Sequence, residues 1–313
     1  MPNLREAPMT PLAILLSDMH ITDQVPRGRA EKNWLNEVLL PRAKALRLAV
    51  DQYRCPILVA GDVFDRWAPS VEVVNWVMDN LPVMYSIPGQ HDMPGHNYEG
   101  RYRGAYGTLV RARLLRDLVP GTYGGIIDGW SITAVPWGHP IPPGLGKNSL
   151  IMAHVYAADG KATMYHGCEA PAIQTTVTGY SVALYGDNHI PWSRTINGTL
   201  HFNHGCWARR TTMEKNYQPE GFGVLWSDGT ITRVAYNEPE LWVEDAVLPE
   251  DANPHPMAEA ARYLKFVSAC RSAKLNDVDF LGKLSAAAVR AGAEVAGVLT
   301  EVREHCAGQR ERI

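Results

Sequence analysis

The chain has 313 residues, 46% of them hydrophobic, and a formal net charge of −3, which suits a packed globular core and gives no overall nucleic-acid signature. The longest early apolar run, Leu12 to Leu16, is too short for a membrane span and lacks the charged start and cleavage site of a signal peptide. Five cysteines without a Cys-x-x-Cys pair argue against a disulfide framework, so we expect a cytoplasmic protein with no membrane contact.

The first half of the chain alternates short apolar runs with helical patterns. The apolar runs 12–16, 56–60 and 83–87 predict strands, and the stretches 30–53 and 70–80 predict helices. This strand, helix, strand order predicts parallel strands covered by helices. Because it lacks an amide hydrogen, Pro41 is expected to start, kink or split the first helix.

The segment from Glu99 to Asp117 carries most of the local positive charge. Five arginines against two acids leave it with a net charge of +3, and Tyr102 and Tyr106 lie among them. Such a patch can hold phosphates and stack bases. The alternative is that "GTLVRARLLRDL" forms an amphipathic helix whose arginines are merely solvated.

From Thr122 onward the pattern changes to closely spaced strands. The predicted strands are "YGGIID", "WSITAVPW", "SLIMAHV", "SVALYGD", "GTLHFN", "GFGVLW" and "TITRVAY". The dipeptides Asp128-Gly129, Asn197-Gly198 and Asp228-Gly229 predict hairpin turns between some of them. An α/β half followed by a β-rich half can close one domain of two sheets.

The end of the chain predicts a linker and then helices. A stretch rich in proline and glutamate follows Tyr236, and helical patterns begin at about Met257. We therefore expect residues 1–250 to form one domain and residues 251–313 a C-terminal helical extension. The apolar stripe of that extension suits packing on its own domain or docking of a partner.

Acids, histidines and amides follow five of the predicted strands. Because the carboxyl ends of strands in an α/β fold meet at one crevice, these side chains are expected to converge. They are Asp18 and His20 in "SDMHITD", Asp62 and Asp65 in "GDVFD", Gln90, His91 and Asp92 in "GQHD", His154 in "MAHVY", and Asp187 and His189 in "YGDNH".

In this order, the five motifs resemble those of the calcineurin-like metallophosphoesterase superfamily. That signature runs Asp-x-His, Gly-Asp-x-x-Asp, Gly-Asn-His-Asp or Glu, an isolated His, and Gly-His-x-His, and the resemblance covers residues 12–236. Within the superfamily, "GDVFDRWAPSVEVVNWVM" is most similar to SbcD nucleases, relatives of the Mre-type DNA repair nucleases. The resemblance implies an α/β fold, a two-sheet β-sandwich flanked by helices in four α/β/β/α layers, and metal-dependent hydrolysis of DNA phosphodiesters.

The resemblance also implies two divalent ions. By analogy, Asp18, His20 and His189 hold one ion, Gln90, His154 and Asp187 hold the other, and Asp62 bridges both. Two of these positions depart from the family pattern, which has Asn in place of Gln90 and His in place of Asp187.

The two departures have different chemical consequences. Gln90 offers the same carbonyl oxygen as Asn from one methylene further out. Asp187 replaces an imidazole nitrogen with a hard anionic oxygen, which favours Mn²⁺ or Mg²⁺ over Zn²⁺. We expect two Mn²⁺ ions, with Mg²⁺ as the alternative; a site with one tight and one weak ion, or a decayed site, are the rival interpretations.

Six further residues are candidates for catalysis and substrate contact, or for orienting those that do so. His91 is expected to donate a proton to the departing oxygen, with Asp92 or Asp65 orienting its ring. The residues expected to bind nucleic acid are His96, Arg101 and Arg103, although a plain loop role for His96 remains open.

The resemblance also predicts partners. DNA is the expected substrate, an SbcC-like SMC-type ATPase is a partner for the helical extension, and a homodimer would form through the helices at about 70–80 and 105–117. A phosphomonoesterase or small-molecule phosphodiesterase of the same superfamily is the first alternative. A partner-binding module without activity on the same fold is the second.

Overall fold

A computed structural model describes residues 9–159, 164–165, 168–169, 177–211, 214–217, 220–236 and 240–242. By its internal contacts the chain divides into two units, Met1–Val243 and Glu244–Ile313, and every described residue belongs to the first. The expected helical extension at 251–313 lies outside the described residues. It stays a prediction, as does the boundary at residue 250.

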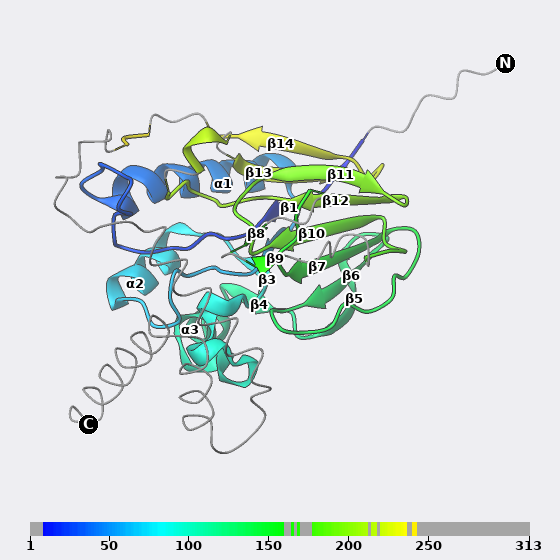
Figure 1. Cartoon of the computed structure of the whole chain (residues 1–313), viewed down its shortest axis with the longest axis horizontal. Coiled ribbons are helices and arrows are strands. Elements are labelled where there is room, and N and C mark those ends of the chain that lie inside the picture. The colour runs from blue at the N-terminus through cyan, green and yellow to red at the C-terminus, as the bar shows by residue number, and fades with distance from the viewer. Residues whose placement is uncertain are drawn as a thin grey trace, which may run out of the picture. The chain divides into compact units, whose positions relative to one another are not determined.

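Six strands form the first sheet in the order β14-β13-β1-β2-β3-β4 (Figure 1). Strands β1 to β4 are parallel to one another, while β13 runs antiparallel to both β1 and β14. The strands are β1 (Pro11–Leu16), β2 (Ile57–Ala60), β3 (Met84–Ile87), β4 (Leu115–Asp117), β13 (Glu220–Trp226) and β14 (Ile231–Ala235). A late segment of the chain therefore completes the sheet that the first segment starts.

The second sheet also has six strands, in the order β11-β12-β10-β7-β6-β5. Its four central strands are parallel, and each edge strand forms an antiparallel hairpin with its neighbour. The strands are β5 (Gly121–Ile127), β6 (Trp130–Val135), β7 (Ser149–His154), β10 (Val182–Gly186), β11 (Trp192–Ile196) and β12 (Thr199–Asn203). A separate pair, β8 (Met164–Tyr165) and β9 (Cys168–Glu169), lies between β7 and β10 in the chain.

The helices of the first half follow the predicted pattern with one exception. As expected from Pro41, the predicted helix at 30–53 is split into a π-helical turn, η1 (Leu35–Leu39), and α1 (Leu40–Tyr53), which has Pro41 in its first turn. The segment "GTLVRARLLRDL" is not one amphipathic helix, because α3 (Ala105–Arg111) ends early and the chain continues as β4. The remaining helix, α2 (Val71–Asn80), is capped by the Ser70 side chain, which accepts from the amide of Val73.

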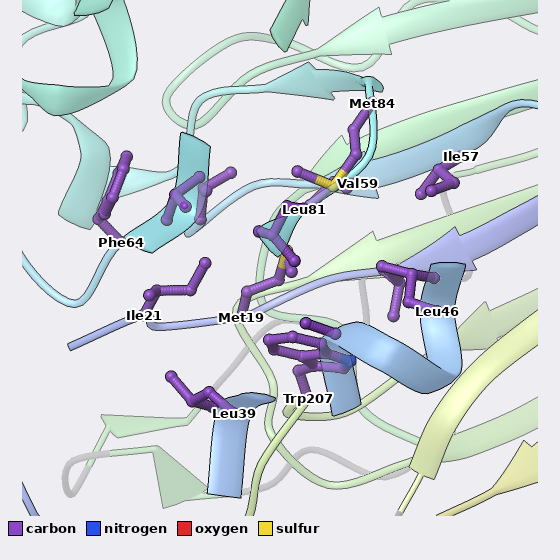
Figure 2. Packing of buried hydrophobic residues seen from close by; sticks show 14 of the residues in the cluster. Met19, Ile21, Leu39, Leu46, Ile57, Val59, Phe64, Leu81, Met84 and Trp207 are labelled. Carbon is purple, nitrogen blue, oxygen red and sulfur yellow. The ribbon is translucent and has the colours of Figure 1, made fainter. Parts of the chain in front are cut away.

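Alternation of side chains along the strands divides the buried hydrophobic residues of the described part of the chain among three clusters. In β1, Ile14 and Leu16 pack with the helices, whereas Ala13 and Leu15 face the second sheet. Figure 2 shows the helix-side cluster, where Leu46 of α1 and Val59 of β2 gather with the buried Trp207. This arrangement confirms the predicted sandwich of two sheets flanked by helices.

The two sheets touch where the central strands end. A Cβ atom on Gly186, at the end of β10, would lie 2.1 Å from the carbonyl oxygen of Ala60 at the end of β2. Only glycine allows this close approach of two backbones. The carboxyl ends of strands from both sheets therefore meet, and the loops that follow them share one place.

The three predicted hairpin turns are all present. Asp128-Gly129 joins β5 to β6, Asn197-Gly198 joins β11 to β12, and Asp228-Gly229 joins β13 to β14. Within the described ranges, no helix combines the length and apolar character that crossing a membrane requires.

Candidate metal centre

The loops after β1 and β2 are bound to each other through their backbones. The amide of Asp18 donates to Gly61, and the amide of His20 donates to the carbonyl oxygen of Asp62. Asp18, His20 and Asp62 have positive φ angles of 48°, 43° and 51°, which residues other than glycine rarely adopt. Strained conformations of this kind cluster at functional sites and persist only where the surroundings enforce them.

Asp18, His20 and His189, the first predicted ligand set, lie together. The Nε2 atoms of His20 and His189 are 3.0 Å apart, and each lies 3.8 Å from Oδ1 of Asp18. Two ligands at right angles on an ion with bonds of about 2.1 Å are about 3 Å apart, so the pair of nitrogens has the spacing that a small divalent cation needs. These three residues fit one ion.

Glu214 holds the His189 ring in place, and sequence reasoning missed it. Its Oε1 lies 2.8 Å from Nδ1 of His189, while Oε2 accepts from the amides of Arg210 and Thr211. This bond leaves Nε2 of His189 directed at the cluster, as carboxylates commonly do for metal-binding histidines. No motif surrounds Glu214 in the sequence, so only the fold brings it to the site.

Asp62 and His154 bring a second set of atoms to the same place. Nδ1 of His154 donates to the carbonyl oxygen of Ala60 at 2.6 Å, which directs Nε2 to within 3.4 Å of Oδ2 of Asp62. Both atoms, together with Oε1 of Gln90, are buried and have no hydrogen-bond partner. Buried polar atoms normally have hydrogen-bond partners. Three unpaired atoms on candidate ligand residues therefore indicate a place for a cation.

A glycine lets the third loop approach Asp62. A Cβ atom on Gly89 would lie 2.1 Å from Oδ1 of Asp62, so any other residue there would displace the carboxylate. The same oxygen accepts from the amide of His91 at 2.9 Å. Asp62 is therefore held in place by the loop after β3 as well as by the loop after β2, to which it belongs.

Gln90 and Asp187, the two departures from the family pattern, contact each other. Nε2 of Gln90 donates to Oδ1 of Asp187 at 2.7 Å, and the backbone amide of Asp187 donates to both carboxylate oxygens of Asp18. The bond orients Gln90 so that its amide nitrogen is occupied and its carbonyl oxygen stays unpaired. The extra methylene of Gln90 and the carboxylate of Asp187 thus complement each other.

The charges of the cluster require a compensating cation. Burial raises the pKa of Asp18 to about 6, although His154 and His189 oppose the shift. Burial alone would lower the pKa of His154, but Asp62 and then Asp18 and Asp187 outweigh it and raise that pKa to about 10. The buried carboxylates thus favour the protonated form of the His154 imidazole, whose positive charge compensates theirs. A divalent cation that displaces this proton can supply the positive charge in its place.

His91 lies at the exposed rim, and its orienting partner differs from the prediction. Nδ1 of His91 lies 2.7 Å from the backbone carbonyl oxygen of Asp65, so neither predicted carboxylate orients the ring. Asp92 is fully buried and accepts from the amides of Val63, Phe64 and Gly89. Its carboxylate ties the loops after β2 and β3 together, and this is a structural task.

The residues expected to bind nucleic acid are placed differently from one another. His96 is exposed, with its ring edge against Trp137, and Arg103 is exposed in the short helix η4 (Tyr98–Arg103). Arg101 contacts Tyr98, Tyr102 and Asp117 instead, and only 11% of its side chain is exposed. Arg101 would have to give up these contacts to bind a phosphate.

Geometry alone selects three groups of side chains that can hold an ion. Within each group the ligand atoms lie within 4.8 Å of one another; the groups are Asp18, His20 and His189; His20, Asp62 and His91; and Asp18, Asp62 and His154. In the described part of the chain, no such group includes Asp187. The ligand roles of the seven predicted residues stay predictions, and His91 becomes a candidate ligand as well as the expected proton donor.

Comparison with known proteins identifies one family, and it also finds solved structures of low similarity. The profile of the calcineurin-like phosphoesterase family matches residues 13–264, whereas no curated protein sequence is significantly similar. An archaeal phosphodiesterase of known structure is 13% identical, covers 72% of this chain and 99% of its own, and has a TM-score of 0.40.

Two bacterial structures are similar to the same extent. A metallophosphoesterase from Sphaerobacter thermophilus is 14% identical over 72% of this chain and 89% of its own, with a TM-score of 0.37. The calcineurin-like phosphoesterase YfkN from Bacillus subtilis is 12% identical over 73% of this chain and 89% of that one, with a TM-score of 0.39. The family profile covers both sheets and all five motifs, so the sequence match is the stronger of the two findings.

The contact between Glu214 and His189 predicts a loss of metal affinity on mutation. Glu214→Ala should weaken Mn²⁺ binding about 10- to 100-fold, because His189 loses the partner that orients it. Isothermal titration calorimetry measures this, with Glu72→Ala on the exposed face of α2 as the matched control. Equal Mn²⁺ affinities for the two variants would show that Glu214 has no such role.

The contact between Gln90 and Asp187 predicts that their effects on metal binding are coupled. Gln90→Asn and Asp187→His should each weaken the second Mn²⁺, because each breaks the bond between the two side chains. The double variant restores the family pattern, so it should recover affinity with a coupling of about 0.5–3 kcal/mol and bind Zn²⁺ better than the parent does. Calorimetry of all four proteins with both metals tests this; additive losses would refute it.

Proposed function

This chain belongs to the calcineurin-like phosphoesterase family, and we propose that it hydrolyses phosphodiester bonds, with DNA as the substrate, using two divalent cations. The observation that carries the proposal is the convergence of Asp18, His20, Asp62, His154 and His189 at the meeting point of the two sheets. Mn²⁺ is the proposed metal, because the carboxylates and the amide oxygen of the second ligand set favour hard cations.

The residues of this centre would hold the cations, orient the substrate and transfer a proton. Divalent ions held there would polarise the phosphoryl oxygens and supply a nucleophile from water at neutral pH. Asp18, His20 and His189 would hold one ion, Gln90, His154 and Asp187 the other, with Asp62 between them. The fit rests on the paired nitrogens 3.0 Å apart and on the unpaired atoms of Asp62, His154 and Gln90.

His91 is proposed to protonate the departing oxygen. Its Nδ1 is bound to the carbonyl oxygen of Asp65, and its side chain is exposed, so Nε2 remains available to a substrate. Histidine side chains placed in this way commonly act as general acids towards a departing oxygen. The amide of His91 is tied to Asp62, which fixes the ring beside the ligands.

DNA is proposed as the substrate on the resemblance to SbcD nucleases and on the exposed His96 and Arg103, which follow the loop of Gln90 and His91 in the chain. A small-molecule phosphodiester is the second candidate. It is favoured by the formal net charge of −3 and by the commitment of Arg101 to internal contacts. The homodimer and the SMC-type ATPase remain proposals that rest on the same resemblance, and the helical extension that would bind the ATPase lies outside the described residues. The cytoplasmic location remains a proposal that rests on the sequence composition.

A direct digestion experiment separates the two substrates. With Mn²⁺ present, the protein should degrade linear duplex or single-stranded DNA, and a chelator should abolish the activity. Rates on bis(p-nitrophenyl) phosphate and on p-nitrophenyl phosphate, measured alongside, report diesterase and monoesterase activity. Hydrolysis of the small diester without DNA degradation would select the second candidate, and no hydrolysis of any ester would refute both.

The role of His91 can be tested by varying the leaving group. His91→Ala should slow DNA hydrolysis about 10²- to 10⁴-fold but affect bis(p-nitrophenyl) phosphate much less, because nitrophenolate departs without a proton. Mn²⁺ affinity, measured by calorimetry, should stay at the parent value. A loss of bound Mn²⁺ would instead assign His91 to the ligands, and equal losses of rate on both substrates would argue against a proton donor.

A further inference from the structure

Arg210 lies at the metal centre without being part of any motif. Its backbone amide donates to Oε2 of Glu214, whose other oxygen bonds His189. Its guanidinium group donates through Nη2 to Oδ1 of Asp65 at 2.5 Å. One residue is thus fixed both by the carboxylate that orients a proposed ligand and by a residue of the loop after β2.

Asp65 places Arg210 and His91 on the same side of the centre. While its carboxylate holds the guanidinium group of Arg210, its backbone carbonyl oxygen holds Nδ1 of His91 at 2.7 Å. The same carboxylate oxygen lies 3.7 Å from Nδ1 of His20. A positive side chain, the proposed proton donor and a proposed ligand therefore surround Asp65.

The guanidinium group still has donor capacity after these contacts. Nε of Arg210 is buried without a hydrogen-bond partner among the described residues, while 21% of the side chain remains exposed. A buried charged donor without an acceptor is costly, so an acceptor is expected to come from a ligand. The planar fork of arginine matches the oxygens of a phosphate, and an arginine already held by a carboxylate loses little freedom on binding.

We propose that Arg210 binds a non-bridging oxygen of the substrate phosphate, and that Asp65 positions Arg210 and His91 to act on the same phosphoryl group. The inference deepens the proposed function, on which it rests, by adding a substrate-contacting residue. Asp65 thereby acts as a positioning residue through its carboxylate and its backbone. The ligand chemistry is that of an anionic phosphoryl group, so inorganic phosphate is a sufficient probe.

The test measures phosphate binding separately from turnover. Arg210→Met removes the charge at similar length, and Arg210→Lys keeps the charge but loses the fork. Calorimetry of inorganic phosphate with the Mn²⁺-loaded protein should show about 10- to 100-fold weaker binding for Arg210→Met and a smaller loss for Arg210→Lys. Mn²⁺ affinity without phosphate and the thermal midpoint should stay near the parent values.

Two further measurements complete the test. Arg47→Met on α1, an exposed arginine whose Nη2 donates to the backbone carbonyl oxygen of Asp79, is the control and should bind phosphate as the parent does. With bis(p-nitrophenyl) phosphate, Arg210→Met should raise KM by a similar factor. Unchanged phosphate affinity, or a parallel loss of Mn²⁺ that would assign Arg210 a structural role, overturns the inference, as does a parent protein that binds no phosphate.

The outcomes distinguish this inference from the proposed function. A parent protein that binds phosphate but hydrolyses no ester refutes the function, while the Arg210 variants still report on the phosphate contact. A parent protein that hydrolyses diesters with full phosphate affinity in Arg210→Met keeps the function and refutes the role of Arg210.

Discussion

The candidate centre depends on one buried carboxylate, Asp62. Its Oδ1 accepts from the amide of His91, its Oδ2 lies within 3.7 Å of the rings of His20 and His154, and its carbonyl oxygen binds the amide of His20. A negative charge buried this deeply is tolerated only beside positive charge and donors. The surrounding loops supply donors in fixed positions, and the remaining demand for positive charge is what suits the site to cations.

Much of the fold follows from local sequence signals. The hairpin dipeptides act over a few residues, and the apolar runs that became β1, β2 and β3 are buried on both faces, so both patterns survive in the sequence. Strands β4 and β11 escaped prediction because they are edge strands with exposed arginines and little hydrophobic pattern. Their existence is decided by the neighbouring strand, which local patterns do not encode.

The candidate site was predictable only where its residues follow strands. The loops after β1, β2, β3, β7 and β10 each follow a buried strand. Their acids and histidines therefore stood out in the sequence. Glu214 and Arg210 come from a segment between β12 and β13 without a motif, so their positions emerge only in three dimensions. The complementarity of Gln90 and Asp187 was invisible for the same reason: 97 residues separate two side chains that share one hydrogen bond.

The return of β13 to the side of β1 determines when the centre can exist. His20 and His189 are 169 residues apart in the chain, and β1 pairs with a strand that starts at Glu220. During synthesis, the loop after β1 cannot make these contacts until the distant segments have been made. Such long-range pairing is slow to form. The first sheet is therefore incomplete until residues 220–226 have been synthesised, so capture of a cation at this centre follows the synthesis of strands from both sheets.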